Sequence, residues 1–293
     1  MTLDLASVLL QWGVGILAFL YVTSRGRLVS LGYGWLLRAV GAAMLAGGLW
    51  ALLARDPSST ARDITAVLTG VAVLGALGAL AVSVVRRGAG VRAARERAAA
   101  RAERVAAMAG GAVGTTVGAP PADGPADGPE FPPALDLVAP IAGAGALLAC
   151  AATVGGPYPL AAYRLLVGAA FLGVLTDAML LGHWYLTQPG LPREPIRELV
   201  RWAAPIWVLE VIGMLWPIGM VSVLIGSISD GYGGILAWMW AISAASTGVL
   251  VLVTWLALKE RSYSAVMAAT GLLYLAILTG FGTDVLARAL LAP

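Results

Sequence analysis

The sequence has little charge, a single cysteine and a single histidine. Charged residues make up 12% of its 293 residues, about half the share typical of a soluble domain. Because Cys150 is alone, no disulfide or CxxC site can form within the chain. Because His183 is alone, a haem held by two histidines of this chain is excluded, as are multi-histidine copper or zinc sites.

Recognisable catalytic and nucleotide-binding motifs are also missing. The glycine-rich string GAVGTTVG, residues 111–118, lacks the Lys-Ser/Thr ending of a phosphate-binding loop. No CxxCH motif for covalent haem and no serine–histidine–aspartate arrangement is recognisable. The sequence therefore requires no cofactor and does not favour an enzyme, and no motif fixes a substrate.

Long apolar runs are what the sequence has instead, and 59% of its residues are hydrophobic. A membrane-spanning helix needs about 20 mostly apolar residues. The runs are continuous and lack the alternation of barrel strands. We therefore expect an all-α, polytopic transmembrane helix bundle of about eight spans. The predicted spans are Leu5–Ser24, Leu31–Ala54, Ile64–Val85, Leu135–Gly155, Ala161–Leu186, Ala203–Ile228, Gly234–Leu258 and Ser264–Leu286.

The basic residues predict the orientation of these spans. The segments after spans one, three, five and seven hold fourteen of the nineteen basic residues, and the opposite side holds Arg55, Arg62 and Arg288. Cytoplasmic loops carry the excess of arginine and lysine. We therefore expect a multi-pass protein of a bacterial inner (plasma) membrane, with both termini outside the cytoplasm.

The long connection between spans three and four divides the chain into three parts. Residues 1–87 form a three-helix membrane part, 88–133 a cytoplasmic connection, and 134–293 a five-helix membrane part. Residues 86–110 are rich in alanine, arginine and glutamate, which favour a helix extending span three. Residues 111–133 are rich in proline and glycine and predict a disordered linker.

The expected partners follow from this composition. The lipid bilayer is the first, and arginines between Arg86 and Arg104 would meet anionic lipid headgroups. A helix that is simply solvated explains the same charges. Other membrane-protein subunits or a second copy of the chain remain open, whereas basic residues placed between apolar runs do not indicate nucleic-acid binding.

Three ionisable residues within the spans are candidates for a functional site. With a rise of about 1.5 Å per residue, Arg38, Asp177 and Glu210 should lie about 10–15 Å inside the cytoplasmic face. An ionisable group in hydrocarbon is costly and marks a functional site by default. The three predict one charged layer that acts as an ion or proton relay. The alternative is a structural pin between helices, with Arg38 reaching toward the interface.

His183 follows Asp177 on the same predicted span. The cluster His183-Trp184-Tyr185 is typical of the membrane interface. The residue therefore fits an interfacial histidine, a pH-sensitive group in the relay, or a contact to haem or quinone. A haem held by histidine and methionine would use Met214 or Met220 of span six.

Two functions of different classes remain open at the level of sequence. The first is a transporter or ion- or proton-translocating protein that uses the intramembrane carboxylates Asp177 and Glu210. The second is an accessory or anchor subunit of a respiratory membrane complex, in contact with haem or quinone through His183.

Overall fold

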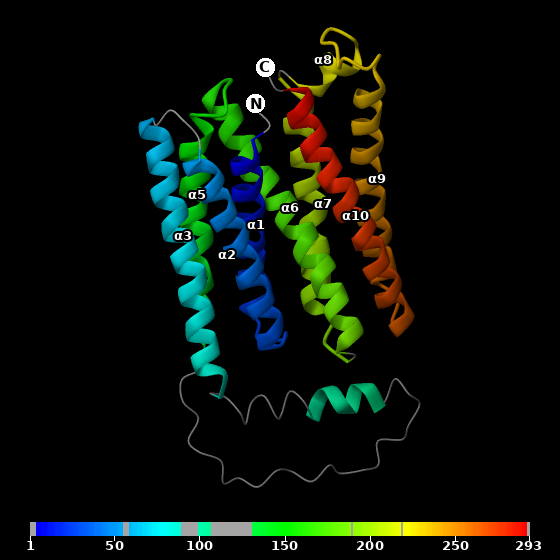
Figure 1. Ribbon diagram of the computed structural model, residues 1–293. Helices are drawn as coiled ribbons and strands as arrows, with labels where there is room; N and C mark the ends of the chain where they lie inside the picture. The colour runs from blue at the N-terminus through cyan, green and yellow to red at the C-terminus, as the bar shows by residue number, and fades with distance from the viewer. Residues whose placement is uncertain are drawn as a thin grey trace.

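The computed structural model describes residues 4–54, 59–88, 99–106, 131–188, 190–217 and 219–291. This part of the chain is helical and contains no strand, which confirms the all-α fold class. The long helices lie side by side in one bundle (Figure 1). Seven described helices are long and apolar enough to cross a membrane. The chain is therefore an integral, multi-pass membrane protein.

The seven apolar helices agree with seven of the predicted spans. They are α1 (Leu5–Ser24), α2 (Leu31–Leu53), α3 (Thr60–Val85), α5 (Val138–Ala151) with the 3₁₀ helix η2 (Pro133–Leu137) before it, α6 (Tyr158–Thr187), α9 (Ile235–Ala257) and α10 (Tyr263–Leu290). The remaining labelled elements are η1 (Arg86–Gly88), α7 (Glu194–Leu215) and α8 (Met220–Leu224). Helix α7 has 22 residues, a length of about 33 Å, and lies within the bundle (Figure 1).

The predicted sixth span, Ala203–Ile228, is wrong at its start. Helix α7 begins at Glu194 and includes a charged segment that the sequence suggested was a loop. These charges have partners among the described residues. Arg201 pairs with Glu194 at 3.1 Å, and Arg197 donates to the carbonyl oxygen of Leu258.

The same prediction is wrong at its end. Helix α7 stops at Leu215, before Pro217, so Ala203–Ile228 is not one continuous helix. The residue before a proline avoids the α conformation, and Trp216 is extended, with φ −139° and ψ 152°. Pro217 therefore ends one helix, and the short α8 follows it.

Asp230 organises the segment between α8 and α9. Its carboxylate accepts hydrogen bonds from the backbone N–H groups of Gly234 at 2.8 Å, Tyr232 at 2.9 Å and Leu236 at 3.0 Å. These donations, the one from Gly234 first, lower the pKa of Asp230 below its ordinary value. The carboxylate thus caps the start of α9.

The two ends of the bundle differ in charge. Both termini lie at one end, here called the terminal end (Figure 1). The opposite end carries connections 25–30, 188–193 and 258–262 together with η1 and residues 99–106, and is called the arginine-rich end. The described basic residues there are Arg25, Arg27, Arg86, Arg87, Arg101, Arg104, Arg193, Arg197, Arg201, Lys259 and Arg261. The even number of predicted spans agrees with termini on one side.

The connection after α3 only partly follows its prediction. Helix α3 stops at Val85 and one 3₁₀ turn follows, so it does not continue as expected, because Gly88 weakens helix propagation. Residues 99–106 are helical and lie across the arginine-rich end (Figure 1). Arg104 ties them to the carbonyl oxygen of Gly190 at 2.8 Å. The predicted disordered linker, residues 111–133, lies outside the described residues except for 131–133.

Helix α6 is the centre of the bundle. Of its most apolar window 72% is buried, against 28% for α3 and for α9. Helix α1 crosses α6 so closely that a Cβ on Gly173 would lie 2.2 Å from the carbonyl carbon of Gly15. A Cβ on Gly15 would lie 1.9 Å from the carbonyl oxygen of Ala169. Two glycines thus let these backbones touch, as small residues do in membrane interfaces.

We expect Gly173→Ala to lower the free energy of unfolding by about 1–3 kcal/mol, because overpacking forces the helices apart. The matched control is Gly70→Ala on α3, where a Cβ meets nothing within 4 Å. Unfolding of the purified protein in detergent, followed by circular dichroism, measures both. Equal unfolding temperatures for the two variants would contradict the close crossing of α1 and α6.

Candidate functional site

Asp177 is a buried acid whose carboxyl group has no hydrogen-bond partner among the described residues. It lies on α6, ten residues before Thr187, which places it about 15 Å from the arginine-rich end of that helix. Its exposure is 0%.

Packing encloses Asp177 from neighbouring helices. Tyr33 of α2 donates its hydroxyl to the backbone carbonyl oxygen of Asp177 at 3.1 Å. Thr176, the preceding residue, accepts a hydrogen bond from Trp12 Nε1 of α1 at 2.7 Å. The hydroxyl of Thr176 donates to the carbonyl oxygen of Leu172 at 2.6 Å. Polar neighbours therefore hold the backbone in place without reaching the carboxyl group.

An ionised carboxylate without partners is costly in such an environment. Two states avoid this cost: the protonated acid and a carboxylate neutralised by a bound cation. Among the described residues, Asp177 therefore has no partner in an ion pair that joins two helices.

Glu210 does not lie at the depth of Asp177, and the predicted charged layer is wrong in this respect. The prediction counted from Ala203, whereas α7 begins at Glu194. Glu210 is sixteen residues from that start, which is about 24 Å along the helix. It therefore lies toward the terminal end of the bundle.

Glu210 belongs to a buried polar cluster near the terminal end, here called the terminal-end cluster. Its members come from four helices and are 0–4% exposed; they are Gln11, Arg164, Glu210, Asp284 and Arg288. Electrostatic interactions join Glu210 to Asp284, Arg288 and Arg164. Two arginines and two acids balance in formal charge, which lowers the cost of burying them.

Hydrogen bonds hold the terminal-end cluster together. Arg288 Nε lies 3.0 and 2.9 Å from the two carboxylate oxygens of Asp284. Gln11 Nε2 donates to Asp284 at 3.1 Å, and the amide oxygen of Gln11 accepts from Arg288. Arg164 Nε donates to the carbonyl oxygen of Gly213 at 2.8 Å. Asp284 and Arg288 were missed at the sequence level, although an acid and a base four residues apart signal a helical pair.

Arg38 is also placed differently from the prediction. Its Nε and Nη2 atoms lie 2.7 and 2.8 Å from the two oxygens of Asp136 in η2. Ser83 of α3 accepts from Nη1 at 3.3 Å, and the ring of Phe131 lies 4.4 Å from Cζ. Asp136 lies near the arginine-rich end of the bundle, at the same depth as Arg38, and therefore pairs with it. Arg38 therefore does not pair with Asp177 or Glu210.

His183 lies on an exposed face of α6, away from the buried Asp177. Its Nδ1 atom is 3.1 Å from the hydroxyl of Tyr274 on α10, and the two rings meet edge to face at 6.3 Å. The next residue, Trp184, donates to Ser30 Oγ at 2.9 Å. The histidine is thus available at the outer surface near the arginine-rich end.

A haem held between His183 and either Met214 or Met220 does not fit the fold. Met214 and Met220 are buried in α7 and α8, toward the terminal end, whereas His183 lies one turn from the other end of α6. Within the described residues no group of three or more histidine, cysteine, aspartate or glutamate side chains could hold a metal ion. Comparisons with protein-family models, curated proteins and solved structures found no match for the chain.

We expect Arg38→Met to lower the free energy of unfolding by about 3–5 kcal/mol, because it leaves Asp136 buried without its counter-charge. Adding Asp136→Asn should restore much of this loss. The matched control is Arg201→Met, since the Arg201–Glu194 pair is 59% and 62% exposed and should cost at most about 1 kcal/mol. Chemical unfolding in detergent measures all three. Equal losses for Arg38→Met and Arg201→Met would contradict the buried pair.

Proposed function

We propose that this membrane protein translocates protons or another ion, with Asp177 as the group that takes up and releases the proton. The observation that carries the proposal is the buried carboxyl of Asp177, whose two oxygens have no hydrogen-bond partner among the described residues. A carboxyl group used only to pin helices would be paired, as Asp136 and Asp284 are. An unpaired carboxyl group fits a residue that binds and releases a proton or another ion.

The terminal-end cluster is the second proton-binding region of the proposed path, through Glu210, one of whose carboxyl oxygens has no hydrogen-bond partner among the described residues. A Cβ on Gly168 would lie 3.0 Å from Asp284 Oδ1, and Gly168 precedes Asp177 by nine residues on α6. The two regions are therefore about 13.5 Å apart along the helix. A proton cannot cross this distance in one transfer between side chains, so the path needs water or a helix movement.

Arg38 and His183 stand outside the proposed path. The guanidinium of Arg38 is held by Asp136, so its part is to stabilise the bundle. The ring of His183 lies on the exposed face of α6 with Tyr274.

The exposed position of His183 favours a second candidate function, that of an accessory or anchor subunit of a membrane complex. An exposed histidine and tyrosine pair at the membrane perimeter could contact haem or quinone held with a partner subunit. A Soret band in the purified protein that disappears in His183→Ala would support this function over ion translocation.

We further propose that the arginine-rich end faces the cytoplasm, with both termini outside it. The excess of arginine and lysine at that end supports this orientation. We also propose that the membrane it spans is a bacterial inner (plasma) membrane.

The orientation predicts different labelling of two introduced cysteines. The chain has a single, buried cysteine, Cys150, which Cys150→Ala removes. In that background Ser229→Cys, at the terminal end, should react with a membrane-impermeant thiol reagent on intact cells. Glu103→Cys, at the arginine-rich end, should react only after the membrane is permeabilised. Both positions are exposed, so the reverse pattern would contradict the proposed orientation.

The proton-binding role predicts the effect of Asp177→Asn. The protein is reconstituted into liposomes that hold a pH-sensitive dye, and a membrane potential is applied. Proton flux should be lost in Asp177→Asn, because the amide cannot take up a proton. The unfolding temperature should not fall, since the carboxyl group has no partner to lose. The matched control Asp63→Asn, an exposed acid on α3, should keep the flux.

Infrared difference spectra between acidic and alkaline buffer give a direct second readout. A carboxyl C=O band of the wild-type protein should be absent in Asp177→Asn and present in Asp63→Asn. Flux and band that persist in Asp177→Asn would overturn the proposed role of this residue.

A further inference from the structure

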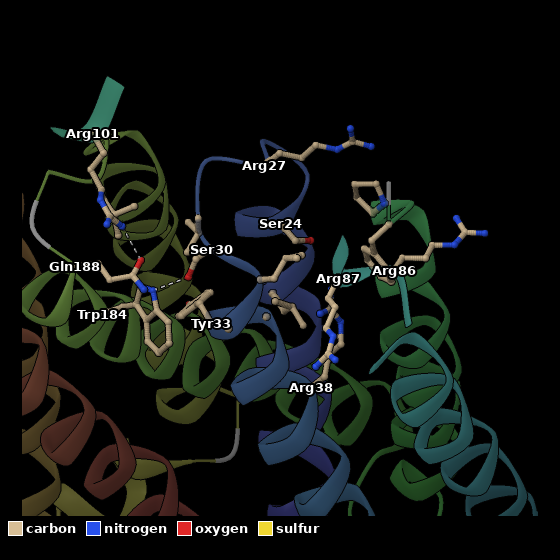
Figure 2. A pocket seen from close by; sticks show the side chains of 18 of the residues that line it. Ser24, Arg27, Ser30, Tyr33, Arg38, Arg86, Arg87, Arg101, Trp184 and Gln188 are labelled. Atoms are coloured by element: carbon tan, nitrogen blue, oxygen red, sulfur yellow. Dashed lines mark hydrogen bonds between the residues drawn. The ribbon is translucent and has the colours of Figure 1, made fainter. Parts of the chain in front are cut away.

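A cavity of about 610 Å³ opens at the arginine-rich end of the bundle. It lies between the first turn of α2, the end of α6, η1 and the helical residues 99–106 (Figure 2). Among the residues that the structure describes, six arginines and no acidic residue line it. The arginines are Arg27, Arg38, Arg86, Arg87, Arg101 and Arg104.

The arginines of this cavity differ in their partners, and two of them bond neutral groups. Arg38 has an acidic partner, Asp136, at 2.7 Å. Arg101 and Arg104 donate to neutral acceptors, the amide oxygen of Gln188 at 3.3 Å and the carbonyl oxygen of Gly190 at 2.8 Å. These bonds orient the two guanidinium groups and leave their charge in place. Like charges gathered in a recess attract an anion.

The arrangement of the arginines separates an inner group from a rim. Figure 2 shows Arg87 directed toward Arg38, whereas Arg27 and Arg86 extend outward. Arg101 reaches the opposite wall beside Gln188 (Figure 2). Arginine side chains on two walls can therefore approach one ligand from different sides, and the planar guanidinium matches the oxygens of a phosphate group.

The start of α2 adds backbone donors to the same cavity. Leu31, Gly32 and Tyr33 are its first residues and line the cavity. The side chain of the N-cap residue Ser30 makes no capping hydrogen bond, and its hydroxyl accepts from Trp184 Nε1. Free N–H groups at a helix N-terminus favour a negative charge.

We propose that this cavity binds a phosphate group, carried either by an anionic lipid or by a soluble phosphate compound. Apolar lining residues, among them Leu20, Leu31 and Phe131, allow an acyl chain to follow the headgroup. The oriented guanidinium groups and the α2 N-terminus hold the phosphate oxygens. This site is inferred from residues other than Asp177.

The test uses the full-length protein purified in a neutral detergent. Binding of inorganic phosphate is measured by titration calorimetry, and retention of phosphatidic acid against phosphatidylcholine by native mass spectrometry. Binding of inorganic phosphate identifies a soluble ligand. Retention of phosphatidic acid without phosphate binding identifies a lipid headgroup. Either result supports the site, and the absence of both overturns it.

Paired substitutions separate the cavity from general surface charge. Arg87→Gln with Arg101→Gln should weaken binding about tenfold or more, because two charge-assisted contacts are lost. The matched pair Lys259→Gln with Arg261→Gln removes the same charge at the same end outside the cavity and should leave binding unchanged. Equal losses in the two pairs would overturn the site. If the cavity pair does not fold, Arg104→Gln, an exposed position, gives the same comparison against Arg261→Gln.

Discussion

The contact of the α1 and α6 backbones at Gly15 and Gly173 fixes the positions of Asp177 and of the terminal-end cluster. Without side chains at these two positions the helices touch, and residues one turn to either side are brought together. Toward the terminal end the crossing places Gln11 against Gly168 and Asp284. Toward the arginine-rich end Asp177 follows Gly173 by one turn on α6. A wider crossing would leave space for lipid or water at both places.

Because a buried charge is costly, the ionisable residues of the bundle fall into two classes, those in ion pairs and the unpaired Asp177. Arg38 with Asp136 and Arg288 with Asp284 form pairs whose side chains are 0–3% exposed, and each partner neutralises the other. Such pairs resist change, because removing one member leaves an uncompensated charge. Asp177 is different, since no described side chain bonds its carboxyl oxygens. This contrast is the physical reason why the paired acids stabilise the bundle and why proton or ion exchange is proposed for the unpaired Asp177.

Hydropathy predicted eight spans, and seven of them agree with apolar helices of the described chain, because the length of an apolar run depends on local composition alone. The depth of Glu210 could not be found in this way, since α7 starts inside a charged segment that is stabilised by its neighbours in space. The partner of Arg38 was missed for a similar reason. Asp136 is far from Arg38 in sequence, and only the packing of η2 against the bundle brings the two together. The prediction of Asp177 as a buried acid needed only its position within one long run.

Tyr33 connects the arginine-lined cavity with the surroundings of Asp177. It belongs to the first turn of α2, which lines the cavity, and its hydroxyl bonds the backbone of Asp177 on α6. A ligand that shifts the start of α2 must therefore move this bond and change the packing beside the carboxyl group. Coupling between two binding sites is reciprocal. The proposed phosphate site and the proposed proton site would then be linked through one side chain, so that occupancy of either alters the affinity of the other.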